Sequence, residues 1–385
     1  KQNGERLERL VLENLLEPDL ETIRSTINLS DYPYGRPGDV GLCHEEFLRL
    51  SEDELVEFLV VAGRSRIEQK VARFAAQRGA ASFLQVMYQA LMTAQGFKSS
   101  KTLYFLLSKR APVQELLEYA RDFPQEKHQA VFFSALLHVA QLFPVQRDFL
   151  EDADEETKSF IRELDEAWAP LRPYLSDRLI PPTKRWKAGM RPASFPERRL
   201  AAIAVLFGRL TRKENNLFRN LLDRIKDTRL NDLAPKDRKK FWKEIIKDFL
   251  VEGEDHYFGR RFSFGGKRQR PQALLGEPAA RSLLFNVFLP LTILYAREKE
   301  DRQLEEHAWM AALQFPALEK NSVVKFMVRR LFGESNREKG LLRQEVFQQA
   351  MLKVFADCCA QNERTCGDCT FLALAERITE KGQGE

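Results

Sequence analysis

The chain has 385 residues, of which 44% are hydrophobic and 30% are charged. This balance is typical of a soluble, folded protein with a substantial core, and it excludes an intrinsically disordered chain. The 61 basic and 56 acidic residues leave a net charge of only +5, so global charge alone does not indicate a nucleic-acid partner.

Apolar residues recur with the helical period of 3.6 along nearly the whole chain, and alternating strand patterns are absent. A capping box formed by Ser51 and Glu54 predicts a helix that Gly63 ends. Gly or Pro closes further predicted helices over 65–79, 80–96, 112–124 and 127–144, and an acidic first turn opens another over 151–168. No motif recurs at a fixed spacing. We therefore expect an all-α fold, an irregular multi-helix bundle or stack in two lobes, residues 1–150 and 151–385.

The most apolar run, residues 283–296, is too short to span a bilayer and contains Asn286 and Pro290. It predicts a kinked, fully buried core helix, and we expect no membrane partner. No apolar leader precedes residue 1, and cysteine is sparse outside the C-terminal part. We therefore expect a cytoplasmic protein.

The most specific chemical signal is a cluster of four cysteines, Cys358, Cys359, Cys366 and Cys369, in the stretch DCCAQNERTCGDC. A C-x-x-C turn directs two thiolates at one point, and a third nearby sulfur supplies most of a tetrahedral site. We predict a C-terminal cysteine-rich metal knuckle that holds zinc or, alternatively, an iron–sulfur cluster. Adjacent side chains on a helix diverge by about 100°, so Cys358 and Cys359 should not both ligate. A fourth ligand is expected from Cys43 or its neighbour His44.

Three other interpretations of the cysteine cluster remain open. A disulfide would suit a secreted domain, and a redox C-x-x-C normally follows a strand in a βαβ unit, which is not visible here. The cysteines could also be inert core residues, because Cys358 continues the apolar helix face of Val346, Met351 and Phe355. Cys43 could likewise be a small core residue in a Gly-rich loop.

Two basic segments point to nucleic acid. Residues 183–199 contain a single acid, and residues 256–271 interleave aromatic rings with cations on a Gly-rich loop. Such a loop could stack bases and neutralise phosphates together, which favours single-stranded DNA or RNA as partner. The candidate binding residues are Lys184, Arg185, Lys187, Arg191, Arg260, Arg261, Phe262, Phe264, Lys267, Arg268 and Arg270.

A structural interpretation of the same segments competes with this one. Charge runs are usually solvated faces, and Phe262 or Phe264 would then plug the loop into the core. Ser194 and Pro196 would cap and begin a helix. The alternative function is a metal-stapled scaffold that binds another protein. Two segments that meet as one exposed basic surface would favour nucleic acid, whereas separated or buried segments would favour the scaffold.

Catalysis within this chain has little support. Cys43 and His44 are adjacent, which prevents a normal nucleophile–base hydrogen bond. The stretch FGGKRQ lacks the spacing and the Ser or Thr of a phosphate-binding P-loop.

Several stretches together resemble one bacterial family, the domain of unknown function 2851. They are DYPYGRPGDVGLCHEEF, ARFAAQRGAASFLQVMYQALMTAQGF, WKAGMRPASFPERRLAAIAVLF, the HYF at 256–258, LLFNVFLPLTILYA and the cysteine tail. The family has no established activity. The resemblance implies that members carry an upstream domain of nuclease-like fold, whose metal-binding carboxylates have no counterpart here. It therefore implies an accessory module of a nucleic-acid-processing protein, with such a domain as a partner. The doubled Cys358 and Cys359 departs from the single cysteine expected there.

Overall fold

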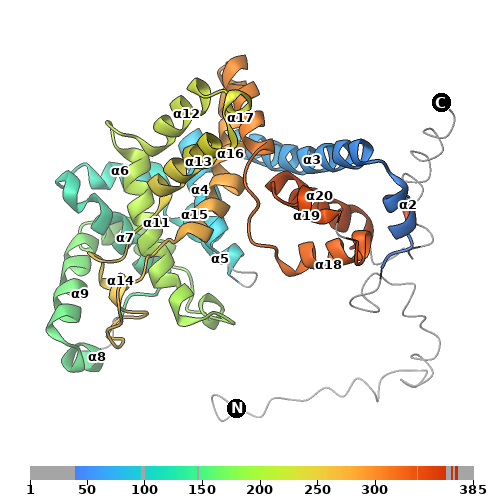
Figure 1. Ribbon diagram of the computed structural model, residues 1–385. Helices are drawn as coiled ribbons and strands as arrows, with labels where there is room; N and C mark the ends of the chain where they lie inside the picture. The colour runs from blue at the N-terminus through green and yellow to red at the C-terminus, as the bar shows by residue number, and fades with distance from the viewer. Residues whose placement is uncertain are drawn as a thin grey trace, which may run out of the picture. The chain divides into compact units, whose positions relative to one another are not determined.

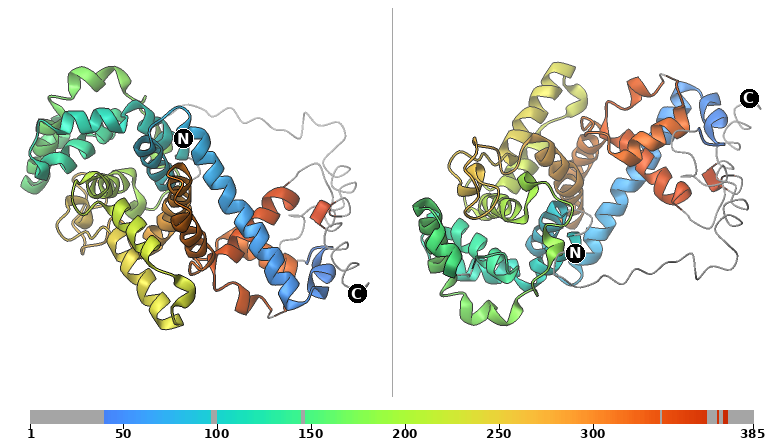
Figure 2. Two further views of the ribbon diagram at one scale, coloured as in Figure 1. Left: turned by 90° about the horizontal axis from the view of Figure 1, so that it is seen from above. Right: turned by 90° about the horizontal axis from the view of Figure 1, so that it is seen from below.

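The computed structural model describes residues 40–96, 100–144, 147–335, 337–360, 366 and 369–371. Within these residues the fold is all-α, which confirms the predicted fold class (Figures 1 and 2). No strand occurs among them; two isolated antiparallel bridges, Val251 with Leu275 and Pro316 with Gln344, are the β-type pairings.

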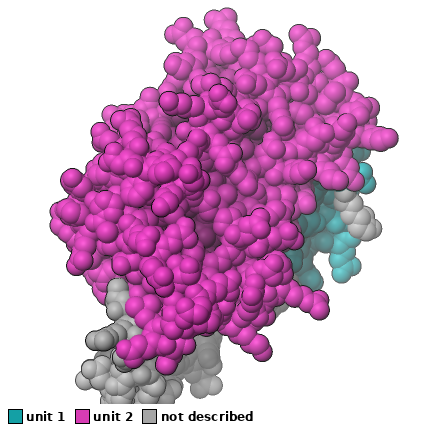
Figure 3. Space-filling view, turned by 90° about the vertical axis from the view of Figure 1, so that its left-hand side faces the viewer, with its two compact units in different colours: residues 1–63, 320–343, 347–385 teal, residues 64–319, 344–346 magenta. Residues whose placement is uncertain are grey.

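The chain divides into two compact units (Figure 3). Among the described residues, unit 1 holds those up to Gly63, those of 320–343 and those from Phe347 onward, and unit 2 holds 64–319 with 344–346. The division predicted near residue 150 falls inside unit 2, within helix α8 (Arg147–Asp152), so these units are not the predicted lobes.

Unit 1 is built from both ends of the described sequence. It contains α2 (His44–Arg49), the start of α3 (Glu52–Arg78), α18 (Ser322–Phe332), α19 (Glu338–Leu341), most of α20 (Glu345–Val354) and a π-helical turn, Phe355–Cys359. The ring of Phe47 packs 5.2 Å from that of Phe332 and 6.0 Å from that of Phe371, measured between centroids. Arg337 donates hydrogen bonds to the carbonyls of Leu48 at 2.7 Å and Leu50 at 2.8 Å. Apolar rings and side-chain hydrogen bonds to backbone carbonyls therefore join the early and late segments of unit 1.

Helix α3 begins at the predicted capping box. The Ser51 N–H donates to Glu54 Oε2 at 2.8 Å, and the Glu54 N–H donates to Ser51 Oγ at 3.3 Å. Gly63 does not end this helix, which continues to Arg78 and merges two predicted helices. A glycine inside a helix costs only about 1 kcal/mol, which the apolar face formed by residues such as Leu59 and Ile67 outweighs.

Unit 2 contains the remaining helices. They are the rest of α3, α4 (Phe83–Gln95), α5 (Lys101–Arg110), α6 (Val113–Ala120), α7 (His128–Val139), α8, α9 (Glu155–Trp168), α10 (Arg172–Leu175), α11 (Pro196–Thr211), α12 (Leu217–Asp227), α13 (Pro235–Phe249), α14 (Tyr257–Arg260), α15 (Glu277–Leu283), α16 (Leu289–Glu298) and α17 (Arg302–Leu313). Helix α7 packs against α9 and α11, α4 against α5, and α16 against α17. One continuous hydrophobic core runs through the unit, with Phe207 at 5.2 Å from Tyr88 and 4.9 Å from Phe132 between ring centroids.

The apolar run predicted as a core helix forms α15, a π-helical turn over Leu284–Phe288, and α16. Pro290, the second residue of α16, has no N–H to bond the carbonyl four residues earlier, that of Asn286, which lies in the π turn. By length and composition, Glu277–Glu298 is the one candidate membrane span in the described residues, with a mean hydropathy of 1.5. Inside the protein 72% of its most apolar window is buried, as in the core helix of a soluble protein.

Candidate metal centre and nucleic-acid interface

All five cysteines of the chain line one small cavity in unit 1. The cavity measures about 20 Å³, and its walls include Cys43, Cys358, Cys359, Cys366 and Cys369. Cys43 stands at the start of α2, whereas Cys358 and Cys359 lie in the π turn that follows α20. The N–H of Cys369 donates to the carbonyl of Cys366 at 3.3 Å, which closes the C-x-x-C turn. Cys43 and the tail thus meet across nearly the whole length of the chain.

Gly41 allows this approach. A Cβ at this position would stand 3.1 Å from both the Cys43 sulfur and Arg330 Cγ, closer than nearly all real contacts. The Gly41 N–H also donates to the Arg330 carbonyl at 2.9 Å, which fixes the loop against α18. A side chain at this position would require Cys43 or Arg330 to shift by a few tenths of an ångström, so glycine suits the close approach of the loop to this helix.

Arg330 is a buried cation at this cavity that the sequence analysis missed. Its Nη2 donates to Cys366 Sγ at 2.8 Å, and its side chain is among the walls of the cavity. Its sequence signal was weak, because Arg330 stands in the helix sequence SVVKFMVRRLF beside a second arginine. A guanidinium this close to sulfurs favours their thiolate forms.

The thiols nevertheless resist ionisation. Burial, together with the neighbouring Cys359, Cys369 and Cys366, raises the pKa of Cys43 to about 12, and Arg330 opposes this rise. Burial also raises the pKa of Cys359 to about 11. A hydrogen bond with Cys369, together with burial, raises the pKa of Cys358. One arginine is thus too little positive charge for several thiolates, whereas a bound metal cation would supply more.

His44, the alternative fourth ligand, is held elsewhere. Its Nδ1 lies 2.8 Å from the Leu331 carbonyl oxygen, and the residue is not part of the cavity wall. Of the two candidates, the structure brings Cys43 to the tail.

The residues present fit a metal by donor type, although the predicted knuckle is not confirmed. Within the described ranges, no set of three or more His, Cys, Asp or Glu side chains already has metal-binding geometry. Residues 361–365 and 367–368, which connect the cysteines, lie outside those ranges. Thiolates select zinc or iron–sulfur clusters, and the cavity that the sulfurs line measures about 20 Å³.

The two basic segments of unit 2 meet through Arg198. This buried side chain belongs to the first segment, and its Nη1 donates to the carbonyls of Phe258 and, at 3.2 Å, Arg261 in the second. Its Nη2 donates to the Ala273 carbonyl at 3.2 Å. The predicted helix start is correct at Pro196, but the residue before it is Phe195 and no side chain caps the helix.

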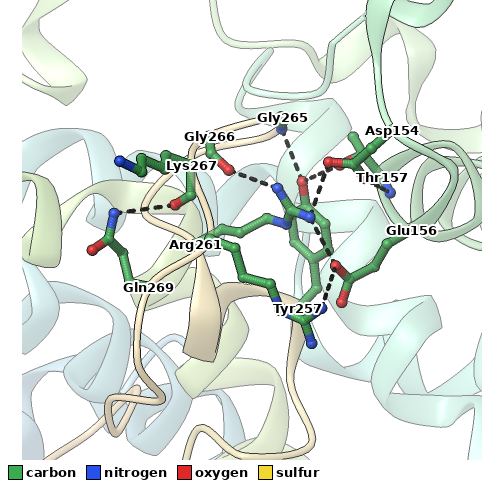
Figure 4. A network of polar contacts seen from close by, with 10 residues as sticks. Asp154, Glu156, Thr157, Tyr257, Arg261, Gly265, Gly266, Lys267 and Gln269 are labelled. Carbon is green, nitrogen blue, oxygen red and sulfur yellow. Dashed lines mark hydrogen bonds and ion pairs between the residues drawn. The ribbon is translucent and has the colours of Figure 1, made fainter.

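Arg261, in the second segment, takes part in a network of hydrogen bonds and ion pairs (Figure 4). Its Nη2 lies 2.9 Å from Asp154 and 2.8 Å from Glu156, and its Nη1 donates to the Gly266 carbonyl at 2.7 Å. The hydroxyl of Tyr257 accepts from the Gly265 N–H at 2.8 Å. With 6% of its surface exposed, Arg261 holds the loop against the start of α9 and offers little to a phosphate.

The aromatic rings of this segment also face inward. Tyr257 and Phe258 are buried, and Phe264 packs against them at 6.1 Å and 5.0 Å between centroids. Phe264 therefore plugs the loop into the core. Phe262 is half-buried, with the Arg198 guanidinium 5.4 Å from its ring centre.

Most other predicted cations are at the surface. Lys187 pairs with the buried carboxylate of Glu197 at 2.5 Å, which gives it a structural role as well. The rest form what we term the basic surface: Lys184, Arg185, Arg191, the half-buried Arg260, Lys267, Arg268 and Arg270. Arg268 has a weak ion pair with Glu156 at 3.9 Å.

A family model described as a protein of unknown function (DUF2851) matches residues 1–322 of this chain. The match confirms the resemblance noted in the sequence, and it ends before the four C-terminal cysteines. Neither the curated proteins nor the solved structures contain a significant match.

Proposed function

We propose that this chain, which belongs to the DUF2851 family, is a non-catalytic helical module that binds single-stranded nucleic acid and is stabilised by a cysteine-ligated zinc ion. The observation that carries the nucleic-acid part is the junction at Arg198. This one side chain of the first segment bonds backbone carbonyls of the second, so the two segments are in contact within unit 2, which supports a joint use of their exposed cations.

The chemistry of the basic surface suits phosphates rather than a particular base. Lys267, Arg268 and Arg270 are exposed on the Gly-rich loop, and long cationic side chains of this kind neutralise phosphates without reading sequence. Phe262 is the ring best placed to stack on a base, since Phe264 is used by the core. The proposed interface is therefore mainly electrostatic.

The zinc part rests on the gathering of sulfurs. Cys359, Cys366, Cys369 and Cys43 come from two distant parts of the sequence and line the same cavity. When bound, zinc would neutralise thiolates and hold the two ends of unit 1 together. An iron–sulfur cluster remains the chemical alternative for the same ligands.

A charge-matched pair of variants tests the nucleic-acid role. Lys267, Arg268 and Arg270 are changed to Ala in one protein, and the exposed Lys127, Arg162 and Arg219 of unit 2 in the other. Affinity for single-stranded DNA and RNA oligonucleotides is measured by fluorescence anisotropy over a range of salt concentrations. The first variant should lose affinity, and its slope of log K against log salt should fall by about 2, because each phosphate contact contributes about 0.7.

Equal affinity in the two variants, or no binding by the unchanged protein, would reject the nucleic-acid role. The protein-interaction scaffold would then be the better hypothesis.

A further inference from the structure

A second basic region of unit 2 is a pocket of about 740 Å³ that the sequence analysis did not anticipate. Helices α3, α4 and α5 form its walls together with α15 and the π turn after it. This volume is within the range of sites that bind cofactors and other small molecules.

The charged side chains that line the pocket are all cations: Arg66, Lys70, Arg73 and Lys101. The first three repeat at helical spacing, which places them on one face of α3. Among the described residues, neither Arg73 nor Lys101 has a carboxylate partner within ion-pair distance. Several cations gathered in one cavity repel each other, so the pocket favours a ligand that carries more than one negative charge.

Lys70 is held in position at the pocket wall. Its Nζ donates to Asn286 Oδ1 at 2.7 Å and lies 5.0 Å from the centre of the Phe285 ring. Asn286 in turn donates to the Ser282 carbonyl at 3.0 Å. Asn286 belongs to the π turn, and such turns are frequent at functional sites.

The surroundings of Lys70 disfavour its charged form. Burial, with the like charges of Arg66 and Arg73, lowers its pKa to about 7, and the charge of Glu345 opposes this shift. A multiply charged anion in the pocket would offset this repulsion.

Uncharged residues that line the pocket indicate which chemical groups the ligand carries besides its anionic part. Gln77 lines the pocket, and its Oε1 is buried without a hydrogen-bond partner among the described residues, so it can accept from a ligand N–H or O–H. The half-buried ring of Phe105 adds an aromatic surface. Inorganic phosphate would satisfy the cations but would leave most of the volume and both of these groups unused.

We propose that this pocket binds a nucleoside phosphate, with the phosphates among Lys70, Arg73 and Lys101 and the base and sugar toward Gln77 and Phe105. Phosphate oxygens accept the charge-assisted hydrogen bonds that these cations donate, and a base supplies both a stacking face and donors. Two sources share this chemistry, a free nucleotide and one nucleotide of a single strand. The proposal is independent of the basic surface, because it uses none of its residues.

The test uses the full chain and ATP labelled with a fluorophore on its ribose. Anisotropy should show saturable binding that unlabelled ATP reverses more effectively than adenosine or inorganic phosphate. Replacing Arg73 and Lys101 with Ala should weaken binding roughly tenfold or more, because two charge-assisted contacts are lost. The matched control replaces Lys127 and Arg162, which are exposed in unit 2 and do not line the pocket, and it should bind like the unchanged protein.

Absence of saturable ATP binding would overturn the proposal, and so would equal losses in the two double variants. A short single-stranded oligonucleotide identifies the source. Displacement of labelled ATP by the oligonucleotide indicates a nucleotide of a strand, and persistence of the ATP signal indicates a free nucleotide. Because the Lys267, Arg268 and Arg270 variant tests the basic surface separately, either proposal can fail without the other.

Discussion

Arg330 donates a hydrogen bond to the sulfur of Cys366 over 2.8 Å, in a cavity that all five cysteines share. This contact puts one fixed positive charge beside a group of thiols that would otherwise share a low-dielectric site. Arg330 acts on the pKa values of Cys43 and Cys359, whereas the sulfur of Cys358 lies 4.0 Å from the hydroxyl oxygen of Thr370. We expect that Cys358 is the cysteine not needed for metal binding.

The first prediction concerns the ligand set. Cys43→Ser, Cys359→Ser, Cys366→Ser and Cys369→Ser should each lower bound zinc, whereas Cys358→Ser should retain it, because adjacent helical side chains diverge by about 100° and only one of Cys358 and Cys359 can complete the set. Elemental analysis of protein purified without oxygen measures zinc and iron together. Neither metal at near-stoichiometric level in the unchanged protein would refute the metal centre, and equal loss in all five variants would refute this ligand set.

Metal binding should also stabilise unit 1. Cys43→Ser should lower the melting temperature followed by circular dichroism more than the surface change Glu45→Ala does, because the staple closes a very long loop. All four tryptophans, at 168, 186, 242 and 309, belong to unit 2. Their fluorescence therefore reports unit 2 and serves as an internal control for a change confined to unit 1.

The second prediction concerns Arg198. Arg198→Ala should lower the free energy of unfolding of unit 2 by about 3 kcal/mol, because the carbonyls of Phe258, Arg261 and Ala273 lose their donor. Arg191→Ala removes an exposed arginine of the same segment and should change it by no more than about 0.5 kcal/mol. Urea unfolding followed by tryptophan fluorescence measures both. Similar values for the two variants would contradict the structural role of Arg198.

The third prediction concerns the close approach of Gly259, in the second basic segment, to the backbone of Gly253. A Cβ on Gly259 would stand 1.7 Å from the Gly253 carbonyl oxygen, so Gly259→Ala should destabilise unit 2 by at least about 2 kcal/mol. Gly208 provides the opposite case inside α11, with nothing within 4 Å of a new Cβ. Gly208→Ala should stabilise the helix by about 0.5–1 kcal/mol. Thermal unfolding of the two variants decides, and a shift in the same direction would be inconsistent with the close approach.

The fourth prediction concerns the loss of folding stability at acidic pH. His138 stacks 4.4 Å from the Trp168 ring and donates from Nδ1 to the Ser134 carbonyl at 2.9 Å. Burial lowers its pKa from 6.5 to about 4; the Ser134 carbonyl and Asp165 oppose this, and Arg172 adds to it. The unfolded state therefore binds a proton first, so stability is full above pH 6.5 and is lost as the pH falls toward 4.

The contribution of His138 is at most about 3 kcal/mol. His138→Phe should remove this part of the pH dependence, which urea unfolding at pH 7 and pH 4.5 can measure. An unchanged pH dependence in the variant would assign the acid sensitivity to other groups.

Local signals in the sequence were sufficient for much of the fold. The Ser51 and Glu54 capping box, the start at Pro196 and the buried run around Pro290 each depend on a few neighbouring residues, and each is found in the structure. The prediction that Gly63 ends the helix was wrong, because a glycine can end a helix or lie within one. Packing of the flanking apolar residues decides between these outcomes.

Long-range partners were harder to predict. The number of ligands that a tetrahedral metal site needs predicted that Cys43, the remaining cysteine, lies near the C-terminal cysteines. In the structure Cys43 lines the same cavity as they do. No comparable argument linked Arg261 to Asp154 and Glu156, because the sequence analysis interpreted these two carboxylates only as part of the acidic first turn of a helix. The pocket beside Lys70 had a signal in the spacing of the α3 cations, but its wall at Asn286 is more than two hundred residues away.

The two-ended construction of unit 1 affects how the chain is made. His44 bonds Leu331 across 287 residues, so the ribosome must synthesise all of that sequence before the partner exists. At ordinary rates of ribosomal elongation this takes on the order of tens of seconds. Throughout that interval, in which residues 64–319 of unit 2 are synthesised, Phe47 has neither Phe332 nor Phe371 to pack against. Translation that stops before α18 therefore leaves Phe47 exposed on the side that these two rings cover.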